Sequence, residues 1–420
     1  MGRQGVRVSC DSLVALGSST ADGNVLFAKN SDRPALECQP LQLVPAATHA
    51  AGDRLRCTYI EIPQAAATFR VIGSRPYWCW GFEHGVNERG VAIGNHTVFT
   101  RDVLVGDGLI GMDLVRLGLE RAATARDAAS VITGLLEQFG QGGSGYGDKQ
   151  WPYHNSFLIA DRESAFVLET SDVHWALRRV RDIASVSNHL TIGTDWDDLS
   201  SGAVAHAHAA GWVAADPDER FDFAGAYRDI EMAPPVISSG RHGRSCSLLE
   251  AERGHLSIES LRRDLRDHYG SAWPNLEMGP IDERYFSLCM HADPVGTTTA
   301  SVIAALPRDT GVPLIYHASL GSPCVGIFLP LFVDGELPEA LTRGGEQADD
   351  SAWWTMKRLL LHVEQDWPSR FPGVRKAMDE LEGRIAAKLP LVVDNAKARN
   401  QLVADSAAEL VELATALTQG

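Results

Sequence analysis

The sequence lacks several features that would quickly assign it to a class of protein. Its 420 residues contain no apolar run near the roughly 18 residues that a membrane-spanning helix needs. Its seven cysteines form no C-x-x-C pair, which argues against a zinc knuckle, a redox motif or a secreted disulfide framework. Basic residues are few, with 38 Lys and Arg against 54 Asp and Glu, so binding to a phosphate backbone is not expected. We predict a cytoplasmic protein with neither membrane nor nucleic-acid partners.

The composition is that of a globular protein, with 45% hydrophobic and 22% charged residues. No internal repeat, low-complexity tract or Pro- and Ser-rich linker divides it. Residues 1–9 are polar and basic and lack the apolar region of a secretory signal. We predict that residues 1–9 form a leader removed on maturation. The rest, 10–420, is expected to be one domain with a helical C-terminal segment from about 350 to 420.

Short apolar runs separated by turns alternate with helical periodicity along the chain. The turn at 21–24 suggests a hairpin, and Thr124 with Asp127 resembles a capping box. This pattern predicts an α+β sandwich of two stacked antiparallel sheets covered by helices. Strands are expected at 12–16, 25–28, 58–62, 68–72, 91–95, 156–160, 165–169, 185–190, 288–291, 314–317 and 326–329. Helices are expected within 109–138, at 258–268, after Ser351, and at 374–388 and 396–417.

Cys10 directly follows the short leader, at the start of the first expected strand. A residue that becomes N-terminal can attack with its side chain while its own α-amino group accepts the proton. An α-amino group titrates near 7.7–8.0, so it is a competent base at neutral pH. Cleavage between Ser9 and Cys10 would expose such a nucleophile. A cysteine near an N-terminus is more often structural, so this position alone decides nothing.

The segment Lys29-Asn30-Ser31-Asp32-Arg33-Pro34 follows the second expected strand. A hairpin would return it to the beginning of the first strand, where Asp32 could hold the α-ammonium group of Cys10. The alternative is a solvated turn with a local salt bridge.

Several motifs together resemble the secernin and dipeptidase A family of N-terminal-nucleophile hydrolases, and secernins most closely. The resemblance extends in order over nearly the whole chain. It rests on Cys10-Asp11-Ser12, Lys29-Asn30-Ser31-Asp32-Arg33-Pro34, Arg75-Pro76, Trp80-Gly81-x-Glu83-x-Gly85-x-Asn87-Glu88-x-Gly90-Val91, Gly111-Met112-Asp113-Leu114-Val115-Arg116-Leu117, Gly140-Gln141-Gly142-Gly143, Tyr153-His154-Asn155-Ser156-Phe157 and Cys289-Met290-His291.

The resemblance implies the αββα fold of N-terminal-nucleophile hydrolases. It implies that Cys10 is both nucleophile and base and that Asp32 contacts its α-amino group. Lys29 stands where acylase relatives carry an Arg, which keeps the charge and loses the bidentate fork.

The same resemblance implies an oxyanion hole made by the backbone of Asn95 and the side chain of Asn188. It also implies an active-site arginine in the stretch 239–244. Arg241 and Arg244 both fit that position, and Arg244 is preferred.

The predicted function is a cysteine-dependent amidohydrolase, a dipeptidase acting on a small peptide or amide, with no metal or organic cofactor. Two alternatives stay open: an acylase or lactonase acting on a non-peptide amide or ester, and a non-hydrolytic secernin-like interaction protein. The sequence leaves the oligomeric state open, a homo-oligomer included.

Two further patterns carry less weight. His206 and His208 have a spacing seen in metal ligands, but no Cys or carboxylate cluster stands nearby in the sequence. The Gly-rich stretch 140–147 follows a helix and lacks the Gly-Lys-Ser/Thr ending of a phosphate-binding loop. A loop near the substrate is the better interpretation.

Overall fold

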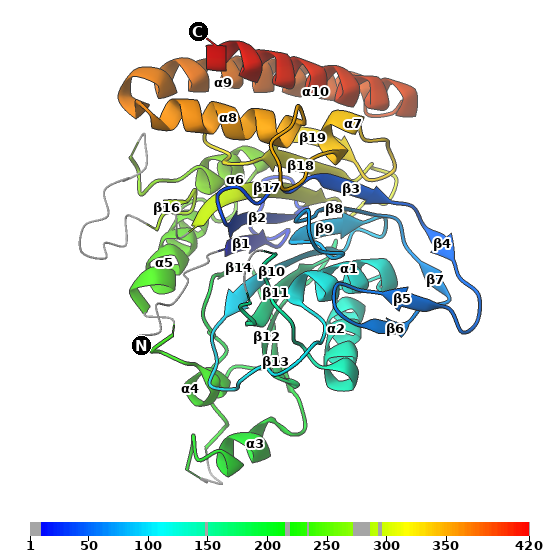
Figure 1. The fold of residues 1–420 in the computed structure, drawn as a ribbon, viewed down its shortest axis with the longest axis vertical. Helices are drawn as coiled ribbons and strands as arrows, with labels where there is room; N and C mark the ends of the chain where they lie inside the picture. Colours follow the sequence, from blue (N-terminus) through cyan, green and yellow to red (C-terminus); the bar gives the residue numbers. More distant parts are fainter. Residues whose placement is uncertain are drawn as a thin grey trace.

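The computed structural model describes residues 10–147, 150–214, 219–232, 235–271, 286–292 and 296–419. Two antiparallel sheets are stacked face to face, and helices cover the outer face of each (Figure 1). The predicted αββα fold class is therefore confirmed. The predicted leader, residues 1–9, lies outside the described residues, and so does the Ser9 side of the predicted cut.

The first sheet carries the strand that begins with Cys10. From edge to edge it consists of β14 (Ile183–Val186), β1 (Cys10–Ala15), β2 (Val25–Arg33), β17 (Gly296–Leu306), β18 (Ile315–Leu320) and β19 (Leu329–Phe332), with β16 (His291–Ala292) paired to β17. β1 and β2 form the hairpin expected around residues 21–24, which brings Cys10 opposite Ser31. The hairpin therefore returns the end of β2 to the start of β1.

The second sheet lies against the first. Its strands are, in spatial order, β15 (Asp198–Leu199), β13 (His174–Arg179), β12 (Ala165–Ser171), β11 (His154–Ala160), β10 (Ala92–Val98), β9 (His84–Asn87), β8 (Val71–Ser74) and β3 (Leu41–Val44). Two small ribbons accompany it, β4 (Ala47–Thr48) with β7 (Ala67–Thr68) and β5 (Arg54–Arg56) with β6 (Glu61–Pro63). The strand expected at 58–62 is the shorter β6.

Helices close both faces of the sandwich (Figure 1). α1 (Gly111–Arg121) and α2 (Ala125–Phe139) pack on the second sheet, and α5 (Pro235–Ala251) and α6 (Ile258–Leu265) pack on the first. α8 (Ala352–Glu364), α9 (Trp367–Val392) and α10 (Ala396–Gln419) pack on one another beside β18 and β19. Three short helices complete the described residues: α3 (Ala203–Ala209), α4 (Phe223–Tyr227) and α7 (Glu339–Thr342).

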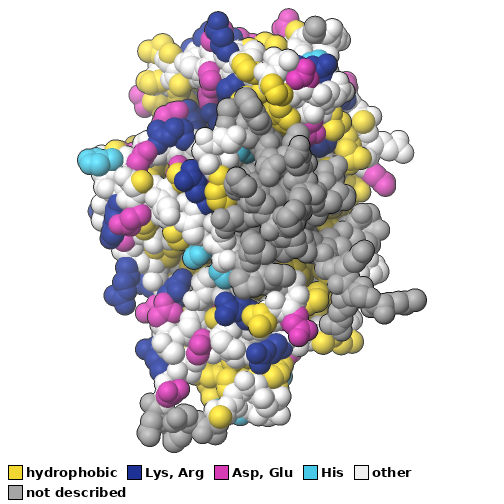
Figure 2. Space-filling view, turned by 90° about the vertical axis from the view of Figure 1, so that its left-hand side faces the viewer, with side chains coloured by type: hydrophobic (Ala, Val, Ile, Leu, Met, Phe, Trp, Pro, Cys, Tyr) yellow, Lys and Arg dark blue, Asp and Glu magenta, His cyan; other side chains and the backbone are white. Residues whose placement is uncertain are grey.

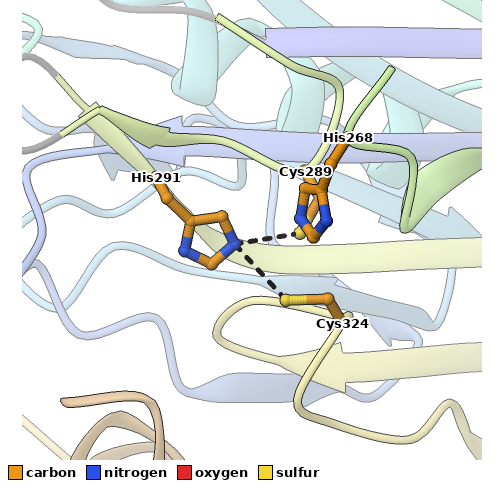
Figure 3. Close-up of side chains that lie close together, drawn as sticks. All are labelled: His268, Cys289, His291 and Cys324. Carbon is orange, nitrogen blue, oxygen red and sulfur yellow. Dashed lines mark hydrogen bonds between the residues drawn. The ribbon is translucent and has the colours of Figure 1, made fainter. Parts of the chain in front are cut away.

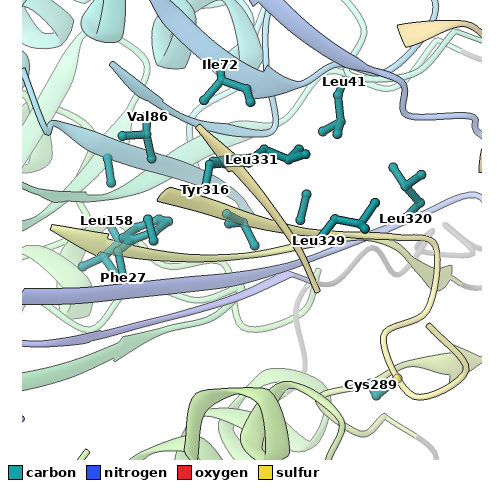
Figure 4. Packing of buried hydrophobic residues seen from close by; sticks show 14 of the residues in the cluster. Phe27, Leu41, Ile72, Val86, Leu158, Cys289, Tyr316, Leu320, Leu329 and Leu331 are labelled. Carbon is teal, nitrogen blue, oxygen red and sulfur yellow. The ribbon is translucent and has the colours of Figure 1, made fainter. Parts of the chain in front are cut away.

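Alternation along the strands divides the core into layers, because successive side chains of a strand point to opposite faces. Val14 and Phe27 pack between the sheets with Leu158 of the second sheet, and Figure 4 shows several members of this cluster. Leu13 and Leu26 point the other way and pack with residues of α5 and α6. The same alternation decides which polar residues of β1 and β2 enter the space between the sheets.

Local capping explains where several helices begin. The Thr124 side chain accepts a hydrogen bond from the Asp127 backbone N–H at 3.1 Å, and Ser351 caps α8 in the same manner. α9 begins at Trp367 and not at the expected residue 374, because Asp366 caps it and a proline is tolerated in its first turn.

Among the elements that sequence patterns did not predict are β17 and α5. β17 lies between β2 and β18 with both faces covered, so its Thr-rich first half is buried and shows no alternation of polar and apolar residues. α5 contains Gly240 and Gly243, which lower helix propensity. Packing against β1 and β14 stabilises it nonetheless.

The surface carries mixed charge. On the face shown in Figure 2, Lys and Arg side chains are interspersed with Asp and Glu over the described residues. Among the described residues, no helix is long and apolar enough to cross a membrane.

Candidate active site

Cys10 begins β1 between its two neighbouring strands and is 3% exposed. Alternation turns its side chain into the space between the sheets, as it does for Ser12, whose hydroxyl lies 2.7 Å from Nε2 of His96 in the second sheet. The Cys10 Sγ lies 4.0 Å from Oε2 of Glu83, just before β9. The thiol therefore lies in polar surroundings between the two sheets.

The Cys10 nitrogen is held separately from the thiol. It donates a hydrogen bond to Oδ1 of Asn188 at 2.8 Å. The β1–β14 register pairs Ser12 with Val186, so its continuation by two residues brings Cys10 opposite Asn188. Nδ2 of Asn188 donates to the Thr97 carbonyl oxygen at 2.9 Å, which fixes the orientation of the amide.

Arg241 completes this arrangement from α5. Its Nη2 donates to Oδ1 of Asn188 at 2.9 Å, and its Nη1 pairs with the Asp11 carboxylate. Arg241 and Asp11 are both fully buried. Asn188 Oδ1 therefore accepts from the Cys10 nitrogen and from a guanidinium at once.

The preference for Arg244 has to be corrected. Arg244 donates two hydrogen bonds to the Asp267 carboxylate, at 2.9 and 2.6 Å, and its side chain is 31% exposed. Arg241, three residues earlier, turns toward β1 and Asn188. The rotation of α5 about its axis decides which of the two arginines faces β1. Their spacing in the sequence does not show which one it is.

A chain of buried charges lies beside the Cys10 thiol. Lys29 Nζ is 3.1 Å from Oε2 of Glu83 and 2.7 Å from the Ser31 hydroxyl. Arg33 Nη1 lies 3.5 Å from the other oxygen of Glu83, and its guanidinium forms a fork with Glu37. Glu83 thus joins both cations to the thiol. Glu83 stands inside the Trp80–Val91 motif, but the motif by itself indicates no role for it.

This environment raises the pKa of the Cys10 thiol to about 12. Burial is the largest cause; the charge of Lys29 opposes it, while Glu83 and Asp32 add to it. A backbone hydrogen bond from Asp32 lowers the value slightly. The thiol is therefore protonated at neutral pH, and its attack on a carbonyl requires a base to accept the proton.

Asp32 lies at the end of β2, on the face opposite Lys29 and Ser31. Its Oδ1 accepts a hydrogen bond from the Thr298 hydroxyl of β17 at 2.6 Å. Its carboxylate is close enough to Cys10 to raise the thiol pKa. The structure shows Asn188 on the Cys10 nitrogen, so contact between Asp32 and a free α-amino group stays a prediction.

Asn95 differs from its predicted role. Its backbone N–H donates to the Glu83 carbonyl oxygen at 3.3 Å, so the sheet already uses the group expected in the oxyanion hole. With its side-chain nitrogen turned toward Glu83, Asn95 would donate to that carbonyl oxygen at 3.0 Å and to Oε2 at 3.3 Å. Its side chain thus lies beside the charge cluster.

The Gly-rich stretch lies against the site. Arg33 Nη2 donates to the Gly145 carbonyl oxygen at 2.6 Å, and its guanidinium lies 4.7 Å from the Tyr146 ring centre. Tyr153 contacts the same guanidinium through its hydroxyl at 3.1 Å. The stretch thus contacts the charge cluster beside Cys10, and its place near a substrate stays a prediction.

Side chains that could hold a metal gather elsewhere. His268, Cys289, His291 and Cys324 bring their ligand atoms together within 4.8 Å. Cys289 and His291 stand in the Cys289-Met290-His291 motif of the family resemblance, which implied no metal. His206, by contrast, pairs with Asp102 at 2.8 Å, while His208 faces the Val213 carbonyl oxygen.

Comparison with known proteins decides the family. Residues 9–227, more than half of the chain, match the model of peptidase family C69. The chain belongs to peptidase family C69. The matched region includes Cys10, Lys29, Glu83 and Asn188; Arg241 and the Cys and His cluster lie outside it.

Two curated relatives of this C69 chain are named probable dipeptidase A, from Streptococcus pyogenes serotype M1 and from serotype M18 (strain MGAS8232). Each is 25% identical over 205 residues, which is 45% of this chain and 41% of the relative. The alignment thus spans less than half the length of these relatives.

Solved structures similar to the C69 chain include a mutant conjugated bile acid hydrolase from Clostridium perfringens, with 12% identity and a TM-score of 0.42 over 74% of this chain and 89% of that one. Penicillin V acylase from Agrobacterium tumefaciens matches with 14% identity and a TM-score of 0.43 over 74% and 83%. The fold assignment rests on the two stacked sheets themselves.

Proposed function

We propose that this chain is a cysteine-dependent amidohydrolase in which Cys10, made N-terminal by removal of residues 1–9, is both nucleophile and base. The hydrogen bond from the Cys10 nitrogen to Asn188 carries the proposal, because it holds that nitrogen in place next to the thiol. A pKa of about 12 for the thiol supports it further, since such a thiol needs a neighbouring base.

The proposed reaction begins with a neutral α-amino group on Cys10. Sγ bonds to the scissile carbonyl carbon while the amine takes the thiol proton, giving a tetrahedral adduct. The ammonium then protonates the leaving amine as the C–N bond breaks, which leaves a thioester on Sγ. Water adds to the thioester with the same amine as base, and the acid product leaves with the thiol restored.

The surrounding charges have distinct proposed parts. The Lys29 ammonium favours the developing thiolate, since its charge lowers the Cys10 pKa. Glu83 holds Lys29 and Arg33 in place. Asn188, expected as the side-chain donor of the oxyanion hole, already donates to the Thr97 carbonyl oxygen, so its proposed part is to orient the α-amino group through Oδ1. Asp32 stabilises that group when it is charged.

Dipeptides are the proposed substrates. The support is family membership together with the printed name of the two streptococcal relatives. A free α-amino base does not restrict the acyl group, so amides and esters of other acids form the competing substrate class. The seven free cysteines fit the predicted cytoplasmic location.

Intact mass and N-terminal sequencing of the purified chain test the nucleophile. We expect a loss of about 1 kDa, nine residues at the chain's mean residue mass, with Cys10 first. Cys10→Ala, in which the thiol is missing, should keep the leader if the cut is autocatalytic. A wild-type chain that begins at Met1 or Gly2 and still hydrolyses amides would overturn the mechanism.

A panel of dipeptides, N-acyl amides and lactones tests the substrate. Turnover of dipeptides by wild type and not by Cys10→Ala supports a dipeptidase. Turnover confined to acyl amides or lactones would replace that assignment with an acylase or lactonase. A correctly processed chain that is inactive on the whole panel would favour the non-hydrolytic interaction protein.

A further inference from the structure

Four metal-ligating side chains from three separate segments meet outside the Cys10 site (Figure 3). His268 follows α6, Cys289 and His291 belong to the segment 286–292, and Cys324 lies in the turn between β18 and β19. All four are buried, and their ligand atoms lie within 4.8 Å of one another. Long sequence separations hide this cluster from motif searches, since only Cys289 and His291 are near each other.

Interatomic distances fit a tetrahedral ion. His291 Nε2 lies 3.5 Å from Cys289 Sγ and 3.3 Å from Cys324 Sγ. An ion bonded to sulfur at about 2.3 Å and to nitrogen at about 2.0–2.1 Å, with tetrahedral angles, separates those atoms by about 3.6 Å. Nε2 of His268 is buried and makes no hydrogen bond among the described residues, so it too is available as a ligand.

Outer contacts orient the ligands in the manner of metal sites. Nδ1 of His291 lies 3.3 Å from the Glu364 carboxylate, so the nitrogen facing the sulfurs can be the unprotonated one. Arg375 donates to the Cys324 carbonyl oxygen at 2.7 Å, and the Ser287 hydroxyl donates to the Cys289 carbonyl oxygen at 2.6 Å. The segments that carry Cys289, His291 and Cys324 are therefore held by contacts beyond the ligand atoms.

We propose that His268, Cys289, His291 and Cys324 bind one Zn²⁺ ion as a closed structural site. Two thiolates and two neutral imidazoles are the donors that zinc takes in tetrahedral sites, and four protein ligands leave no position for substrate. Zn²⁺ balances the charge of the two thiolates, whose protons are released on binding. A neutral site of this kind is compatible with complete burial.

The ion would also stabilise the neighbourhood of the proposed nucleophile. Between two of the ligands, the Met290 backbone N–H donates to the Thr298 hydroxyl at 2.8 Å, and that hydroxyl donates to Asp32 at 2.6 Å. Zinc thus fixes the segment 286–292 against β17 and, through Thr298, positions Asp32. The ion itself makes and breaks no bond in the proposed reaction of Cys10.

Metal analysis of the purified full chain is the first test. We expect about one zinc per chain by inductively coupled plasma mass spectrometry, and X-ray absorption with two sulfur and two nitrogen neighbours at about 2.3 and 2.0 Å. After removal of zinc, added Co²⁺ should give the visible bands of a tetrahedral thiolate site. A chain that contains no zinc and binds neither metal would overturn the proposal, whether its thiols are free or joined in a disulfide.

Substitutions of single cysteines test whether zinc binds at this cluster. Cys324→Ala should lose at least about tenfold in zinc affinity, whereas Cys57→Ala, a matched buried free cysteine elsewhere in the core, should keep wild-type zinc content. If Cys324→Ala fails to fold, chelation of the wild type replaces it: midpoint unfolding temperature should fall with chelator and recover with zinc. Full zinc content in a folded Cys324→Ala chain would contradict the site.

Discussion

Cys10 and Cys324 are equally buried, at 3% and 2% exposure, yet their surroundings act on the thiol in opposite directions. Burial is the largest cause that raises the pKa of Cys10 to about 12; the charge of Lys29 opposes it, and the carboxylates Glu83 and Asp32 add to it. Burial would likewise raise the pKa of Cys324, but a hydrogen bond from Cys289 and the charge on His291 hold it well below its ordinary value. The pKa values of the two thiols therefore differ because of their neighbouring groups, and not because of their burial.

The two proposed sites use cysteine in different ways. A nucleophile with its own base can remain a thiol until substrate arrives, because the base removes the proton during attack. A metal ligand has to be a thiolate for as long as the ion is bound. The space between the sheets offers carboxylates and a lysine, whereas the loops beyond β17 offer imidazoles.

The largest expected effect is that of Cys10→Ala on hydrolysis, and it distinguishes the Cys10 site from the proposed zinc site. Cys10→Ala should reduce hydrolysis by more than about 10³-fold, because the nucleophile is lost, while the zinc content stays at the wild-type level. Steady-state kinetics and metal analysis on the same preparation measure both. Loss of zinc in this variant would show that the centres are not independent.

Lys29→Met should lower the free energy of unfolding by about 3 kcal/mol, because it leaves the buried Glu83 with Arg33 alone as its cationic neighbour. The matched control is Arg54→Met, which breaks an ion pair with Glu61 whose side chains are 54% and 47% exposed. It should cost less than about 1 kcal/mol. Denaturant unfolding compares them, and equal losses would contradict the importance assigned to the buried cluster.

Asn188→Ala should lower kcat about 10- to 100-fold with little change in KM, because the α-amino base loses the acceptor that orients it. That acceptor also favours the charged amine, so its removal lowers the amine pKa. The acid limb of the kcat/KM profile, in which activity rises as the amine becomes neutral, should shift to lower pH. An unshifted limb with reduced kcat would indicate a purely structural role.

The smallest expected effect is on stability and comes from the burial of one carboxyl group, Asp264. Burial raises the pKa of Asp264 on α6 to about 7, so the folded state favours the neutral carboxyl. Its favourable contribution is complete below the unfolded pKa near 3.9 and is lost as pH rises through about 7. Asp264→Asn should therefore be more stable than wild type by about 1–2 kcal/mol at pH 8 and nearly equal to it at pH 4. Thermal unfolding at both pH values checks this; the same gain at each would contradict it.

The sequence by itself determined much of the architecture. Hairpin turns, alternation and helix caps such as Thr124 and Ser351 act between residues close in the chain, so they can be read locally. The stacked antiparallel sheets and the C-terminal helices followed from them. Family motifs also selected Cys10, Lys29, Asp32 and Asn188, which the register of β1 with β2 and β14 brings to one end of the first sheet.

Tertiary structure alone decided the rest. The rotation of α5 chose Arg241 over Arg244, and the stacking of the sheets placed Glu83 between Lys29 and Arg33. β17 was missed because a strand buried on both faces loses its alternation. The His268, Cys289, His291 and Cys324 cluster joins three loops far apart in sequence. Contacts between distant segments depend on how whole elements pack, and local sequence patterns carry no record of that packing.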